Sequence, residues 1–95
     1  MAAAIKAFAH KGLERFFKTG AKGGIQPAHA NRLRLILTAL NGATAPGDMA
    51  LPGLGLHPLK GKMADRWAVS VGGNYRVIFG FDGRDAIRVD YIDYH

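Results

Sequence analysis

The sequence contains no cysteine and only one serine, Ser70. Without cysteine, a disulfide framework, a cysteine-ligated metal site and a thiol nucleophile are all excluded, and a single serine argues against a serine-based catalytic triad. No apolar run approaches the roughly 18 residues that a membrane-spanning helix needs. The first residues also lack the charged region that precedes the apolar part of a signal peptide. We therefore expect a cytoplasmic protein that does not interact with membranes.

The chain is short, with 95 residues, and 48% of them are hydrophobic. This length is typical of one domain, and the apolar share is large enough to fill a core, which excludes a charged disordered tail. We find no internal repeat, no low-complexity tract and no linker between two apolar regions. The sequence therefore predicts a single domain over residues 1–95.

Acidic residues are scarce: seven Asp and Glu stand against 13 Lys and Arg, a formal charge of +6. The surplus is confined to the first 40 residues, which hold seven basic residues and Glu14 alone. A basic domain gains affinity for phosphates by releasing condensed counterions, although an ordinary solvated surface is the alternative. We interpret this half as a docking surface for nucleic acid. Its basic residues include Lys11, Arg15, Lys18, Lys22, Arg32 and Arg34.

The first half of the chain has helical periodicity. Between residues 10 and 19, apolar side chains repeat at i, i+3 and i+4, the pattern of an amphipathic helix. A second helix is expected from Pro27, a residue favoured in the first helical turn, to the stop signal Asn41-Gly42. Together they predict a helical hairpin. The preceding segment, Ile5 to Phe8, is either an edge strand or part of the first helix.

The last third of the chain changes to a period of two residues, which is typical of strands. Its alternating segments are separated by the turn signals Gly72-Gly73-Asn74 and Asp82-Gly83. We expect a three-strand antiparallel meander with the helices on one face and the other face open. The predicted class is α+β, a helical hairpin packed on a small twisted antiparallel sheet. Three leucines in or next to the connector 43–55 are expected to reach the core: Leu51, Leu54 and Leu56.

Between residue 57 and the end of the chain, few polar side chains are of the kinds that catalyse reactions. His57 is a candidate general acid or base, and Lys60 is a candidate fixed cation. Arg76 is expected in the middle of a strand, on the face opposite Tyr75. The chain ends in a carboxylate, a phenol and an imidazole: Asp93, Tyr94 and His95. Taken singly, His57 and Lys60 are better explained as ordinary exposed residues, a chain end is usually free of function, and for Arg76 the two explanations are equal.

Together these side chains fit the cleavage of an RNA phosphodiester bond without a metal. That reaction needs a base for the ribose 2′-OH, cations for the negatively charged phosphorane and an acid for the leaving oxygen. His57, Asp93 and His95 are also a conceivable metal ligand set. Their spacing matches no strong metal motif, however, and Lys60 and Arg76 would repel a cation. We therefore expect no metal and no cofactor.

The chain resembles the HigB-type toxins of the RelE/ParE superfamily, the toxin halves of bacterial toxin–antitoxin pairs. The resemblance rests on four motifs in order: His10-Lys11-Gly12-Leu13, residues 56–61 (LHPLKG), Asn74-Tyr75-Arg76-Val77 and residues 90–95 (DYIDYH). It implies the RelE-like fold and a catalytic set of His57, Lys60, Arg76, Asp93, Tyr94 and His95. The chain departs from the family at Tyr75, where Trp is common, and in the turn before Asn74, which lacks a basic side chain.

The resemblance implies a type II toxin that cuts mRNA codons in the A site of the 70S ribosome by 2′-OH attack and so inhibits translation and growth. Its partners would be ribosomal RNA, mRNA and a HigA-like helix-turn-helix antitoxin, with operator DNA bound only through that antitoxin. Lys60 and Arg76 would stabilise the transition state, and Tyr94 would orient the nucleotide. How His57, Asp93 and His95 divide the proton transfers stays open. The alternatives are a ParE-like gyrase inhibitor, a non-catalytic nucleic-acid-binding module and a catalytically silent co-repressor.

Overall fold

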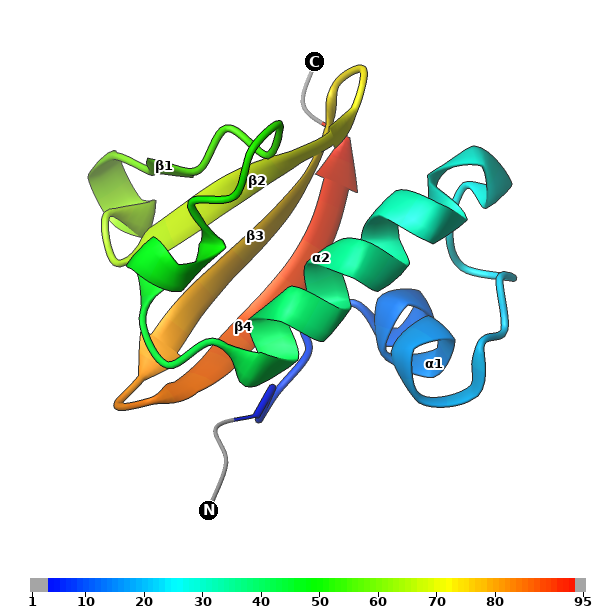
Figure 1. Cartoon of the computed structure of the whole chain (residues 1–95), viewed down its shortest axis with the longest axis horizontal. Coiled ribbons are helices and arrows are strands. Elements are labelled where there is room, and N and C mark those ends of the chain that lie inside the picture. Colours follow the sequence, from blue (N-terminus) through cyan, green and yellow to red (C-terminus); the bar gives the residue numbers. More distant parts are fainter. Residues whose placement is uncertain (1–3, 94–95) are drawn as a thin grey trace.

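The computed structural model describes residues 4–93, which form two α-helices packed on a four-stranded antiparallel sheet (Figure 1). The helices are α1 (Lys11–Thr19) and α2 (Ala30–Gly42). The strands are β1 (His57–Pro58), β2 (Arg66–Gly72), β3 (Tyr75–Asp82) and β4 (Asp85–Asp93). Three short 3-10 helices lie between these elements: η1 (Pro27–His29), η2 (Pro46–Met49) and η3 (Gly61–Met63). The predicted α+β class, with helices first and an antiparallel sheet after them, is confirmed.

Helix α1 begins one residue later than predicted because His10 caps it. The backbone N–H of Leu13 donates a 2.9 Å hydrogen bond to the His10 Nδ1, which satisfies one of the unpaired donors of the first turn. At the other end Gly20 adopts a left-handed conformation with φ 81°, and its N–H bonds the Phe16 carbonyl. The helix presents Leu13 and Phe16 to the core.

Helix α2 supplies the centre of the core. Its side chains Leu33, Ile36, Leu37 and Leu40 are fully buried, and each such burial contributes roughly 1.5–3 kcal/mol. They belong to one cluster with the inward residues of the sheet, among them Phe79. Figure 1 shows α2 lying along the sheet with α1 beside it, so both helices cover the same face.

The strands follow one another in the sheet in sequence order, β1-β2-β3-β4. The predicted three-strand meander was therefore one strand short: β1 pairs with β2 through His57 opposite Ala68. The β3–β4 hairpin closes at Asp82 opposite Asp85, so its two turn residues are 83–84, one position later than predicted. The segment before α1 lies parallel to β4 through bridges at Ile5 and Phe8, which makes it an edge element and not part of the helix.

The connector between α2 and β1 is fixed by its own polar and apolar contacts. Leu54 is 1% exposed, and its carbonyl accepts a 2.7 Å hydrogen bond from the N–H of Ser70. Leu56 packs against the core as predicted, whereas the prediction for Leu51 was wrong because its side chain is 37% exposed. The Asp48 carboxylate accepts from the backbone and hydroxyl of Thr44, which ties η2 to the end of α2. Within residues 4–93, no helix has the length and apolarity needed to cross a bilayer.

Candidate active site

The sheet face opposite the helices carries Arg76. Along β3, Val77 and Phe79 belong to the core cluster, so Arg76 and Ile78 point to the other face. Arg76 was predicted on this face, but it is the second residue of β3 and not its middle. Its Nη1 donates to the carbonyl oxygens of Gly73 (3.1 Å) and Tyr75 (2.9 Å). These bonds hold the guanidinium beside the turn between β2 and β3.

His57 shares that face with Arg76. Directly paired residues of antiparallel strands point to the same side, and His57 pairs with Ala68 while Arg76 pairs with Ser70, two residues further along β2. The two side chains are therefore two strands apart, about 10 Å across the sheet. His57 is exposed. Its Nδ1 lies 3.0 Å from the Gly55 carbonyl. A carbonyl only accepts, so this bond places the proton on Nδ1 and leaves Nε2 able to accept one.

Lys60 is exposed at the end of the same edge strand. The N–H of Leu59 donates to the Arg66 carbonyl at 2.9 Å, which keeps the chain beside β2 up to the residue before Lys60. Gly61 then takes a positive φ of 68° and starts η3. The LHPLKG motif thus places an imidazole and an ammonium group at one edge of the sheet.

Asp93 lies on the other face of the sheet. It pairs with Tyr75, and its neighbour Ile92 pairs with Arg76. Arg76 and Asp93 consequently occupy one corner of the sheet but point to opposite sides. The other two predicted terminal site residues, Tyr94 and His95, lie outside the described residues. Across residues 4–93, no three His, Asp or Glu side chains are grouped so as to hold a metal ion.

A pocket of about 420 Å³ opens beside Asp93, and the sequence did not reveal it. Its walls come from the start of α1, the loop before η1 and the ends of β3 and β4. The lining residues are His10, Gly23, Gly24, Ile25, Gln26, Tyr75, Tyr91 and Asp93. The Gln26 side chain donates to the Tyr75 hydroxyl at 3.2 Å, and the two tyrosine rings lie 5.2 Å apart. The lining of the pocket thus combines two tyrosine rings with polar side chains.

Tyr91 links this pocket to the helices. Its hydroxyl lies 2.7 Å from the Nδ1 of His29 and accepts from the N–H of Gln26 at 3.4 Å. Burial raises the pKa of Tyr91, and the nearby Tyr75 and Asp93 raise it further, while the bond from Gln26 acts in the opposite direction. The phenol is therefore neutral at physiological pH. A buried phenol requires a polar partner. A tyrosine at position 91, within an apolar strand, was therefore the one sign in the sequence that polar groups meet here.

The six basic residues predicted for docking fall into two groups. Lys11, Arg15 and Lys18 line a shallow hollow on α1 together with Glu14, which pairs with Lys18 at 3.0 Å. Lys22 is exposed in the loop that follows. The remaining two make contacts within the protein. Arg32 donates to the carbonyls of Gly53 (2.5 Å) and Ser70 (3.4 Å), and Arg34 lies over the ring of Phe16 at 5.3 Å.

Comparison with known proteins identifies the class to which this fold and site belong. Residues 6–95 match the model of a family described as the RelE-like toxin of type II toxin–antitoxin system HigB. The Endoribonuclease HigB of Proteus vulgaris is 37% identical over 91 residues, which cover 96% of this chain and 99% of the relative. The molecule is thus a RelE-like toxin of a type II toxin–antitoxin system. Specifically, the chain belongs to the HigB-like toxin family.

Membership of this family confirms the resemblance stated from the sequence motifs, and with it the class of endoribonuclease toxins. It also implies an antitoxin as a partner. The match is to HigB and extends through the region that carries His57, Lys60, Arg76 and Asp93. It therefore favours a ribonuclease over the gyrase-inhibiting alternative.

Proposed function

We propose that this toxin cleaves mRNA codons in the A site of the translating ribosome. The observation that carries the proposal is the common face of His57 and Arg76, joined by the registers of β1, β2 and β3. Lys60 follows β1 by two residues and is exposed. An imidazole and a guanidinium on one sheet face, with an ammonium group near the same edge strand, are the kinds of group that an RNA phosphodiester needs in order to be cleaved.

The proposed reaction is an in-line attack of the ribose 2′ oxygen on the adjacent phosphorus. A base removes the 2′-OH proton, the bond from phosphorus to the 5′ oxygen breaks, and an acid protonates that oxygen. The products are a 2′,3′-cyclic phosphate and a free 5′-OH. Lys60 and Arg76 stabilise the charge of the phosphorane. The hydrogen bond of His57 to Gly55 supports a role as base, because it leaves Nε2 to accept the proton.

The proton transfers are divided among His57, Asp93 and His95, and Tyr94 orients the nucleotide. The pocket beside Asp93 supports a role for this carboxylate, because it offers room for a nucleobase next to it. Arg76 lies at the same corner but points to the other side of the sheet, so the RNA would have to pass around this end of the sheet. The half-buried ring of Tyr75 supplies the kind of surface on which unstacked RNA bases are held. The nucleotide on one side of the cut bond would then enter this pocket.

The partners follow from the same proposal. The exposed cations of α1 and the loop after it dock on ribosomal RNA in the cytoplasm, with Lys11, Arg15, Lys18 and Lys22 in contact with phosphates. Arg34, which is exposed over the Phe16 ring, extends this docking surface, and Arg32 adds a partly exposed cation on the same helix. A HigA-like helix-turn-helix antitoxin neutralises the toxin, and the complex binds operator DNA through the antitoxin alone.

The experiment is cleavage of a defined mRNA by the purified chain, with and without 70S ribosomes that hold a chosen codon in the A site. We expect cuts only in the presence of ribosomes, only within that codon, and with cyclic phosphate ends. Replacing His57 by Ala should lower the rate by about 10²–10⁴-fold. Lys60→Ala should also slow cleavage, because it removes a cation that stabilises the phosphorane. Lys62→Ala is its matched control and should cleave at the parental rate, because Lys62 is also an exposed lysine in the same segment. Equal cleavage of free mRNA would refute ribosome dependence.

A further inference from the structure

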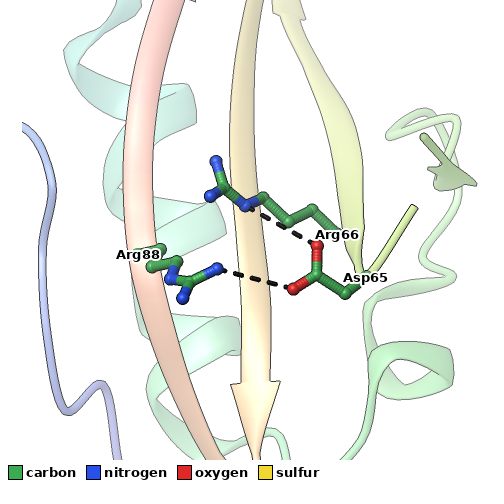
Figure 2. Close-up of polar contacts among 3 residues, drawn as sticks. All are labelled: Asp65, Arg66 and Arg88. Atoms are coloured by element: carbon green, nitrogen blue, oxygen red, sulfur yellow. Dashed lines mark hydrogen bonds and ion pairs between the residues drawn. The ribbon is translucent and has the colours of Figure 1, made fainter. Parts of the chain in front are cut away.

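A second group of charged residues lies on the open face at the other end of the sheet. Figure 2 shows the Arg66 side chain reaching across β3 and the Arg88 side chain extending toward β3 from the other side, with the Asp65 carboxylate on the β2 side, opposite Arg88. The Asp65 Oδ2 lies 3.4 Å from the Nη1 of Arg88, and its Oδ1 lies 4.0 Å from the Nε of Arg66. One carboxylate thus faces two guanidinium groups.

This carboxylate leaves much of the hydrogen-bonding capacity of the two arginines unused. Each guanidinium carries five N–H donors, and close charge-assisted bonds are about 2.7–2.9 Å long. Both distances to Asp65 exceed that range. Within residues 4–93, the Nε of Arg66 is buried and has no hydrogen-bond partner. The arginine side chains themselves are 25% and 53% exposed, so their remaining donors can reach a ligand.

The backbone is arranged to place these side chains over β3. The pairing of β3 with β4 shifts register between Ile78 and Gly80, and the residue on the opposite strand, Arg88, has a positive φ of 53°. Irregularities of this kind redirect a side chain and are frequent beside functional sites. The Arg66 side chain passes close to Gly80 of β3, where a β carbon would lie 3.8 Å from the Cγ of Arg66.

We propose that Arg66 and Arg88 form a subsite for a phosphate of the RNA backbone. The proposal rests on the proposed function, because its ligand is the same RNA strand that His57 and Arg76 act on. Arg66 lies on the open face four residues along β2 from Ser70, the partner of Arg76. That spacing is about 13 Å along the strand, so the subsite holds RNA a short distance from the cut bond.

A phosphate fits these two arginines better than an acidic protein segment does. Two planar guanidinium forks match the several oxygens of a phosphate, whereas the carboxylate already present is held at long distances. The subsite also continues the face that carries Arg76, which places its ligand on the path of the RNA. Asp65, with a side chain 68% exposed, is a weak internal competitor that the RNA displaces.

The test is the binding of a fluorescent single-stranded RNA, made uncleavable by 2′-O-methyl groups, measured at a series of KCl concentrations. Arg88→Gln should weaken binding and lower the slope of log affinity against log salt by about 0.7, the effect of one lost phosphate contact on a single strand. Arg84→Gln is the matched control: it removes the same charge from an exposed position in the β3–β4 turn. Asp65→Asn should strengthen binding relative to Asp82→Asn, which makes the same change in charge.

Equal slopes for Arg88→Gln and Arg84→Gln would overturn the subsite, whatever the melting temperatures of the two variants. An unchanged slope together with a weakened antitoxin complex would assign the arginines to a protein partner and would also overturn it. Cleavage on ribosomes is measured in parallel to separate the two proposals. If the parent chain cuts no mRNA on ribosomes, the proposed function is refuted. If Arg88→Gln still binds RNA more weakly than that parent, the subsite is retained.

Discussion

Gly12, at the start of α1, and Gly24, in the loop before η1, are packed against each other with no room for a side chain on either. A β carbon on Gly24 would lie 2.5 Å from the Cα of Gly12, and one on Gly12 would lie 2.7 Å from the Cα of Gly24. This contact holds the loop against the helix. The same loop forms one wall of the pocket beside Asp93, so a contact between two glycines shapes a part of the candidate site.

Replacing Gly24 by Ala should therefore destabilise the fold, because the new methyl group meets backbone atoms that cannot move aside cheaply. We expect a loss of about 1–3 kcal/mol in the free energy of unfolding, measured by denaturant titration. Gly23→Ala is the matched control, since a β carbon on Gly23 has no heavy atom within 4 Å. Equal stability of the two variants would show that the glycine contact is not tight in solution.

The buried phenol of Tyr91 predicts a loss of stability at alkaline pH. Its pKa is raised above the ordinary value of 10.0, so the folded chain holds this proton more tightly than the unfolded chain. The resulting stabilisation is complete below about pH 10 and declines as the pH rises through the folded pKa. Unfolding titrations between about pH 9 and pH 11 should show a steeper decline for the parent than for Tyr91→Phe. Tyr75→Phe, which removes a phenol from the same pocket, should keep most of the decline; parallel curves for the parent and Tyr91→Phe would contradict this explanation.

The contacts of Arg32 predict that it acts on stability, whereas Arg15 acts on docking. Arg32 bonds two carbonyls and so joins the connector to β2, while Arg15 is exposed on α1. Arg32→Ala should lower the melting temperature by several degrees, about the effect of 1 kcal/mol in a domain of this size. Arg15→Ala should leave the melting temperature unchanged and weaken ribosome binding, most clearly at low salt. If ribosome binding is unaffected by Arg15→Ala, the charge of α1 is only a solvated face.

Arg76 is expected to act on catalysis more than on folding. Its two hydrogen bonds go to carbonyls at the edge of the sheet, and its charge faces the open side. Arg76→Ala should reduce the rate of mRNA cleavage on ribosomes by about 10²–10³-fold, with little change in melting temperature. Arg84→Ala removes the same charge from an exposed turn and should cleave at the parental rate. Cleavage by Arg76→Ala at the rate of this control would remove Arg76 from the site.

The elements with a long periodic pattern could be predicted from the sequence. The spacing of apolar residues placed α1 and α2 within one to three residues of their observed bounds, and the alternation along β3 placed Arg76 on the face away from the core. Strand β1 was missed because two residues are too few to show a period, and its second residue is Pro58. Leu51 was misplaced because hydrophobicity alone does not show which leucines of an irregular connector are buried.

The pocket and the arginine pair could not be predicted, for different reasons. The pocket joins residues far apart in the chain, such as His10 and Tyr91, which only the packing of α1 beside the end of β4 brings together. Arg66 and Arg88 face the same carboxylate, and the position of Arg88 depends on an irregular register of β3 and β4. A regular alternation of residues does not predict such an irregularity. In both cases the sequence motifs were enough to identify the family, but only the folded structure shows which residues lie next to one another.

Cleavage of codons during translation can be measured in cells by mapping the 5′ ends of mRNA after a pulse of expression. The chain and its His57→Ala variant should be compared at equal protein levels, with Lys62→Ala as the control variant. We expect new 5′ ends inside translated codons, in frame, for the parent and for Lys62→Ala, and their loss in His57→Ala. New ends in untranslated RNA at equal frequency, or growth arrest with intact mRNA, would contradict it.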